Sequence, residues 1–528
     1  MRHGCLLILM LALPAAIGPG CRAPLPHSAA TLAMRPQQEV ALASHQAAAD
    51  PLPAPPSAPA SAPPSAAEGP KPPEPLPPGE ATPRPPLSLA EVTESVYYAF
   101  PGLEAALHEM EIAAGKEQSA SGEFDLKLKA GSQNDALGFY QTYKNAIKVE
   151  QALWNGGSAY GQYRLGRGKF PSWDGLETND GGEFKVGFLR PLLQNAAIDQ
   201  RRTDIFQATL RRQQVEPAVR ALLLELTRDA ANAYWDWVAA GRGLAVQREL
   251  LRVTVERNRI YEGRVKEGDL PRIELVQNER LIASREAKLV ESERKLQKAG
   301  IKLSLFLRDA NGQPLVPSAE LLPIEFPETT LPDLSQAETL IANSLANRPE
   351  LVELDVIRQQ VELDLAQAQN LSRPELTATL DAAQDVGGPT PKKDKTPFQL
   401  QAGLYFEVPL ERNKAQGKIR ESQGKLAQLA AKRRLVENKI TIEVQDAISA
   451  LTLARERYLR AQENTRLAWQ LVTAERQRFD AQDSDLLRVA IQETAAIEAA
   501  LAEIDALAEF FQAQAAFRAA TAADPLTP

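Results

Sequence analysis

The chain has 528 residues, a formal net charge of −8 and only two cysteines. This acidic balance gives no sign of a nucleic-acid partner, and two cysteines cannot build a disulfide framework. Aromatic residues make up only 6% of the chain. Ala, Gln, Glu, Arg and Leu dominate after residue 195, a composition that favours long helices over a compact globular core.

Residues 1–21 have the pattern of a signal peptide. A basic start precedes an apolar run from Leu6 to Leu13, which is too short to span a bilayer in a mature protein. Cys21 follows small residues, as the lipidated cysteine of a bacterial lipoprotein signal does, although Gly18 and Pro19 depart from that pattern. Two alternatives stay open: a lipoprotein signal that ends at Cys21, or ordinary cleavage nearby.

Residues 22–86 are rich in Pro, Ala and Ser. Such a segment cannot bury a core, so we expect a disordered tether. The folded part is expected to begin near Leu87, with a helix that Ser88 caps, and residues 521–528 are expected to form a disordered tail.

The folded part consists of two similar halves, 87–330 and 331–520, and the second opens at the NRPEL segment Asn347–Leu351. Each half runs through a proline, a helix, a strand, a second strand ending in Pro-Leu and a long helical hairpin. A repeat matched in consecutive elements indicates duplication. The first half is expected to contain strands 123–132 and 183–190, the hairpin 192–307 and a connector; the second, a helix, strands 375–383 and 399–408, and the hairpin 413–520.

Each hairpin contains a helix too long for a compact domain, on the order of 110 Å if unbroken. Apolar residues recur at spacings of three and four, beside rows of alanine. Two adjacent seams with small side chains favour a helix packed against neighbours on both sides, as in a closed wall of helices. An ordinary coiled coil is the alternative.

The segment 134–182 is rich in Tyr, Trp, Phe and Gly, and parts of it alternate between apolar and polar residues. It is either one long loop or an added pair of strands. The pattern alone leaves both open.

The chain resembles TolC-type outer-membrane efflux proteins. The features that carry the resemblance are the order of its elements, the NRPEL opening, the two hairpin tips and the junctions Pro191-Leu192 and Pro409-Leu410. The resemblance implies an α+β membrane protein with duplicated half-repeats, located in the outer membrane of a Gram-negative-type bacterium. It implies a homotrimer with a 12-stranded β-barrel, four strands per chain, continued by a long periplasmic α-helical barrel. It also implies partners: a periplasmic adaptor protein and an inner-membrane transporter, within a tripartite efflux or type I secretion system.

The hairpin tips are the expected docking sites for the adaptor. Gly268 suits a tight reversal because glycine tolerates positive φ. The residues expected at the tips are Gly268, Asp269 and Leu270 in the first hairpin and Gln482, Asp483 and Ser484 in the second. Candidate aperture-lining residues are Asp480, Asp485 and Arg488, although capping and turn formation explain these aspartates better.

The four histidines are scattered, and the sequence contains no metal-ligand spacing, nucleophile constellation or phosphate loop. We therefore expect no enzyme activity, no metal and no cofactor. The alternative to a passive export conduit is a periplasmic coiled-coil scaffold tethered to the envelope by its Pro-rich arm.

Overall fold

The computed structural model describes residues 85–523, apart from 172–173, 310, 324–325, 333, 335, 390–397 and 482. The signal 1–21, most of the tether 22–86 and the end of the tail lie outside these residues. None of the described helices is long and apolar enough to cross a membrane.

Two short helices lead into the fold. In α1, Leu89–Ala99, the side chain of Ser88 accepts a hydrogen bond from the Glu91 amide in a capping box, as the sequence predicts. The next helix, α2, Pro101–Ser121, begins with proline, whose missing amide hydrogen costs nothing in a first helical turn. In the second half, α5, Ala337–Asn347, and α6, Pro349–Asn370, repeat this arrangement.

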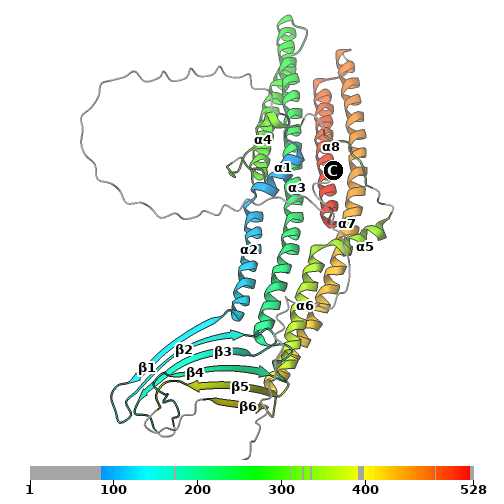
Figure 1. The fold of residues 1–528 in the computed structure, drawn as a ribbon. Helices are drawn as coiled ribbons and strands as arrows, with labels where there is room; N and C mark the ends of the chain where they lie inside the picture. The colour runs from blue at the N-terminus through cyan, green and yellow to red at the C-terminus, as the bar shows by residue number, and fades with distance from the viewer. Residues whose placement is uncertain are drawn as a thin grey trace, which may run out of the picture. The chain divides into compact units, whose positions relative to one another are not determined.

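One antiparallel sheet contains all six strands of the described residues, in chain order from β1 to β6 (Figure 1). Four lie near the strands that the sequence predicts, and two form a hairpin within the segment 134–182. The expectation of four strands per chain is therefore wrong. The strands are β1 Lys127–Asp135, β2 Thr142–Ala152, β3 Ser158–Gly168, β4 Glu183–Pro191, β5 Glu375–Asp385 and β6 Gln399–Glu407.

The first strand begins later than predicted. Gly122–Phe124 form a 3-10 turn at the end of α2, in which the Asp125 amide bonds back to the Gly122 carbonyl. This turn takes Phe124 out of the strand, because a 3-10 turn and an extended strand need different backbone angles. The other three predicted strands agree with the structure to within two residues.

Two helices of 68 residues, α3 Gln200–Glu267 and α7 Asn413–Asp480, follow the last strand of each half. Each is about 100 Å long. The first hairpin is expected to begin at 192, but α3 begins only at Gln200, where Asp199 caps it. The return helices are α4 Arg272–Leu303 and α8 Leu486–Ala520.

The helices form two single rows that share the long helices. Toward the hairpin tips, α3 packs between α4 and α8, and α8 packs on α7; nearer the sheet, α3 packs between α2 and α6, and α6 packs on α7 (Figure 1). Every inner helix therefore has a neighbour on each side, as the paired seams predict. In this order, α4 and α7 form the edges of the first row, and α2 and α7 form those of the second.

The core lies where the two rows meet. The Trp235 ring of α3 stacks on the Phe511 ring of α8, with centroids 4.3 Å apart. In α7, three apolar residues at helical spacing are almost fully buried: Ile440, Val444 and Leu451. These contacts join the helices of both halves through apolar burial.

Candidate functional site at the hairpin tips

The turn between α3 and α4 is built around Gly268. Its φ is +83°, and its amide and that of Asp269 bond to carbonyls of the last turn of α3. A β-carbon at this position would meet nothing within 4 Å, so the backbone angle alone requires glycine here. Asp269 and Leu270 complete the turn before Arg272 begins α4.

The turn between α7 and α8 is held by acidic side chains. Asp485 caps α8 by accepting a hydrogen bond from the Arg488 amide at 2.9 Å, and Asp483 pairs with Arg478 at 3.2 Å. Asp485 therefore acts as a helix cap, and Asp483 forms an ion pair within the turn. Ser484 bonds to the Glu475 side chain. Asp480 is the last residue of α7, and Gln482 lies outside the described residues.

The two tips lie together. The Tyr261 ring of α3 lies 6.2 Å from the Phe479 ring of α7, and burial raises the pKa of the Tyr261 hydroxyl to about 12. Burial and the neighbouring Asp485 carboxylate raise the pKa of Glu274 in the first turn of α4. The first tip therefore lies against the second.

Behind the tips, one buried carboxylate joins all four helices of the hairpins. Glu493 of α8 accepts hydrogen bonds from Arg257 of α3 at 2.7 Å, Arg285 of α4 at 2.9 Å and Arg476 of α7 at 2.7 Å. Arg285 also donates to the Thr254 hydroxyl. A carboxylate without solvent contact is stable only when it is paired and hydrogen-bonded, and here three guanidinium groups do both.

Burial and the charges of this cluster shift the pKa values of Glu493 and Arg285. The pKa of Glu493 is lowered to about 2, because the attraction and hydrogen bonds of the three arginines outweigh the burial that raises it. Burial lowers the pKa of Arg285 despite its bond to Glu493. The cluster holds three positive groups and one negative group, so removing the carboxylate would leave like charges facing one another.

Sequence reasoning missed the Glu493 cluster. Arg285 and Glu493 are 208 residues apart, and neither belongs to a recognisable motif. The available signal was weak: a glutamate on an otherwise alanine-rich helix face, following Val489 and preceding Ala496 and Ile497, all of them buried.

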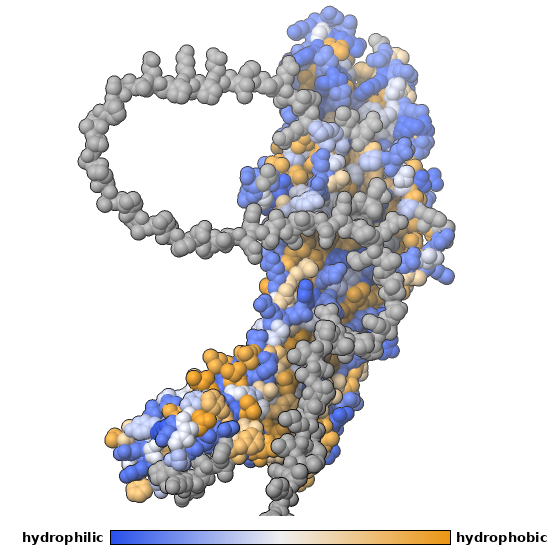
Figure 2. All heavy atoms as spheres, viewed as in Figure 1, coloured by the Kyte–Doolittle hydropathy of each residue, from blue (hydrophilic) through white to orange (hydrophobic). Residues whose placement is uncertain are grey.

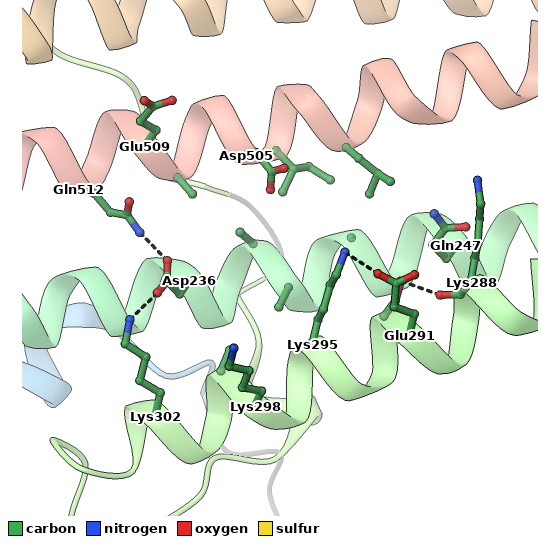
Figure 3. A pocket seen from close by; sticks show the side chains of 18 residues that line it. Asp236, Gln247, Lys288, Glu291, Lys295, Lys298, Lys302, Asp505, Glu509 and Gln512 are labelled. Atoms are coloured by element: carbon green, nitrogen blue, oxygen red, sulfur yellow. Dashed lines mark hydrogen bonds and ion pairs between the residues drawn. The ribbon is translucent and has the colours of Figure 1, made fainter.

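A cleft of about 680 Å³ lies farther from the tips, between α3, α4 and α8 (Figure 3). Lys302 pairs with Asp236 at 2.8 Å, and the Gln512 amide donates to the same carboxylate at 2.7 Å. These contacts bridge the three helices, so they contribute to the helical wall. Within the described residues, no group of three or more His, Cys, Asp or Glu side chains could hold a metal ion.

The two faces of the sheet differ in polarity. One face carries apolar side chains, each of them about half exposed or more. By strand register, this face includes Ile147, Phe184, Val186, Leu380 and Leu404. On the other face, charged side chains pair across neighbouring strands and, in the case of Lys148 and Glu150, within β2. These pairs are Lys129–Glu150, Lys148–Glu150, Arg164–Glu183 and Lys185–Asp381. Figure 2 shows hydrophobic residues gathered over the sheet and its junction with the helices.

Solved structures of outer-membrane channels share this fold. The chain aligns with the outer membrane protein VceC of Vibrio cholerae at 16% identity and a TM-score of 0.58, over 82% of this chain and 96% of VceC. It aligns with the Campylobacter jejuni CmeC outer membrane channel at 14% identity and a TM-score of 0.57, over 82% and 85% of the two chains. For the Neisseria gonorrhoeae MtrE outer membrane channel the identity is 13% and the TM-score 0.57, over 82% and 88%.

The chain therefore has the fold of a TolC-type outer membrane factor, as the sequence resemblance predicts. No protein-family model and no curated protein matches it. The fold is thus recognised through the arrangement of its elements, at sequence identities where few individual residues coincide.

Proposed function

We propose that three copies of this chain form the outer-membrane channel of a tripartite efflux or type I secretion system. The channel is a passive conduit in the outer membrane of a Gram-negative-type bacterium and extends into the periplasm. Its fold is that of proteins described as outer-membrane channels. The observation that supports this role best is the sheet, with an exposed apolar face opposite a charged face, because these faces suit lipid and a wet lumen.

The adaptor protein docks at the tips in this proposal, and the inner-membrane transporter supplies the substrate. The turns at Gly268 and at Asp483–Ser484 lie together at the ends of the hairpins farthest from the sheet, where a periplasmic partner would reach them (Figure 1). A cleft of about 350 Å³ beside them is lined by residues of α3, α7 and α8, including Tyr261, Phe479 and Glu493. The candidates for lining the aperture in this proposal are Asp480, Asp485 and Arg488, of which Asp485 and Arg488 pair with each other at 3.8 Å.

The tethered periplasmic scaffold is the competing function. It gives no role to the exposed apolar face of the sheet, since a soluble rod would bury that surface or lack it. Membrane fractionation separates the two functions. We expect a trimer in the outer-membrane fraction that dissociates only on heating before gel electrophoresis. Recovery of a soluble monomeric or dimeric rod from the periplasm would contradict it.

A further inference from the structure

The hairpin of β2 and β3 is part of the sheet along most of its length. β2 pairs with β1 from Lys127↔Glu150 to Asp135↔Thr142, and β3 pairs with β4 from Ser158↔Leu189 to Arg164↔Glu183. Since β2 and β3 separate β1 from β4, the hairpin widens the sheet by two strands.

A side-chain contact across Gly187 fixes the hairpin at its position in the sheet. The Tyr160 hydroxyl of β3 passes over β4 and donates to the Asp381 carboxylate of β5 at 2.8 Å. A β-carbon on Gly187, the strand residue between them, would lie 2.2 Å from the Tyr160 ring and 2.3 Å from the Asp381 oxygen. Lys185 pairs with the same carboxylate at 3.1 Å. Residues of β3, β4 and β5 therefore hold the β2–β3 hairpin at this position in the sheet.

The hairpin also continues both faces of the sheet. Ile147 and Val149 of β2 are 53% and 36% exposed and lie on the same face as Phe184 and Leu380. On the charged face, the Lys148 ammonium lies 4.2 Å from the centre of the Tyr160 ring. A hairpin held in water outside the membrane would not need an exposed apolar face in register with the other strands.

The outer edges of the sheet are β1 and β6, and each has one strand neighbour among the described residues. Because all neighbours are antiparallel and the number of strands is even, β1 runs opposite to β6. The β1 edge of one copy can therefore pair antiparallel with the β6 edge of the next, and a ring of copies leaves no open edge.

By these general spacings, the width of the six-stranded sheet is close to that of the helical row. Four helices in a row, spaced 8–10 Å apart, cover roughly 32–40 Å of wall. Six strands about 4.8 Å apart and tilted by about 40° cover roughly 37 Å, whereas four would cover about 25 Å. With six strands per chain, the same number of copies closes the β-barrel and the helical barrel at nearly the same diameter.

We propose that β1 of each copy pairs with β6 of the next, and that three copies of the six-stranded sheet close an 18-stranded barrel. This inference rests on the trimeric channel proposed above and adds its width. The lumen is about 1.5 times as wide as that of a 12-stranded barrel, and charged side chains of all three added hairpins line it. The β-barrel is then no narrower than the helical tunnel, so it adds no second constriction for bulky polar substrates.

Two cysteine experiments in isolated outer membranes test this barrel. The first compares Ile147→Cys with its neighbour Ala146→Cys, which lies on the charged face, and uses the parent chain as a blank. A water-soluble maleimide should label Ala146→Cys and leave Ile147→Cys largely unlabelled. Equal labelling of both would place the hairpin outside the membrane and overturn the 18-stranded barrel, while leaving a trimeric channel intact.

The second experiment combines Ala402→Cys of β6 in turn with Leu128→Cys, Ala130→Cys or Ser132→Cys of β1. Oxidation should join neighbouring copies in at least one combination and give covalent dimers and trimers, with no larger product. The inference is overturned if the largest cross-linked product contains a number of copies other than three. It is also overturned if no combination gives a cross-link. Absence of the protein from the outer membrane would overturn the proposed function as well.

A variant that joins Asp135 to Glu183 by a short turn provides a matched narrow barrel, since β1 and β4 are antiparallel and can pair directly. Gln401→Cys on the charged face of β6 is placed in both chains. Maleimide-tipped polyethylene glycols of increasing size, added to intact cells, should reach this cysteine in the parent up to a diameter about 1.5 times the limit for the variant. Equal limits in two assembled proteins would contradict the wider barrel.

Discussion

The guanidinium of Arg285 in α4 donates a 2.9 Å hydrogen bond to the carboxylate of Glu493 in α8, and both side chains are almost completely buried. This pair connects the two helical hairpins close to their tips. Because Arg257 and Arg476 share the same carboxylate, its removal affects every helix of the tip at once.

Replacing Glu493 with Gln should destabilise the tip by about 3–5 kcal/mol, because three arginines lose the charge that compensates them. Backbone hydrogen exchange in the last turns of α3 and the first turns of α8 measures this opening directly. Glu498→Gln, an exposed position on the same helix, is the control and should exchange like the parent. Equal protection in both variants would show that the cluster does not hold the tip.

Acid should loosen the same region. The pKa of Glu493 is about 2 in the folded protein, below its ordinary value of 4.5, so this group stabilises the fold fully above about pH 4.5. That contribution, about 3 kcal/mol, is lost as the pH falls toward 2. Hydrogen exchange at the tip should therefore accelerate over this range in the parent and less steeply in Glu493→Gln. Parallel pH profiles would rule out Glu493 as the titrating group.

Gly268→Val should strain the first tip, since a β-branched residue at a positive φ costs about 1–2 kcal/mol. We expect normal trimers with weaker cross-linking to the adaptor and reduced export. Gly268→Asn is the matched control, because asparagine tolerates this backbone angle better. If the valine variant cross-links and exports like the parent, the tip is not part of the docking surface.

Leu404→Arg should lower the yield of assembled trimer, because an arginine on the lipid face near the middle of a membrane costs about 2–4 kcal/mol. Gln401→Arg places the same side chain on the same strand but on the charged face, and should assemble normally. The heat-dependent trimer band on a gel measures both. Equal yields would mean that the apolar face does not meet lipid.

Much of this protein could be predicted from residue order alone. Helical periodicity around Ile440, Val444 and Leu451 predicted the long α7, and alternation at Leu400, Ala402 and Leu404 predicted β6, because both patterns are local. Gly268 marked its turn for the same reason: a left-handed backbone angle is a property of one residue.

Two features depended on tertiary structure. Whether 134–182 forms a loop or strands is decided by partners such as Asp381, which bonds to Tyr160 across 221 residues. The Glu493 cluster likewise joins four helices whose charged residues look like ordinary solvated side chains in sequence. Local propensity depends on neighbouring residues. The pairing of strands and the burial of a charge depend instead on contacts between segments that are distant in the sequence.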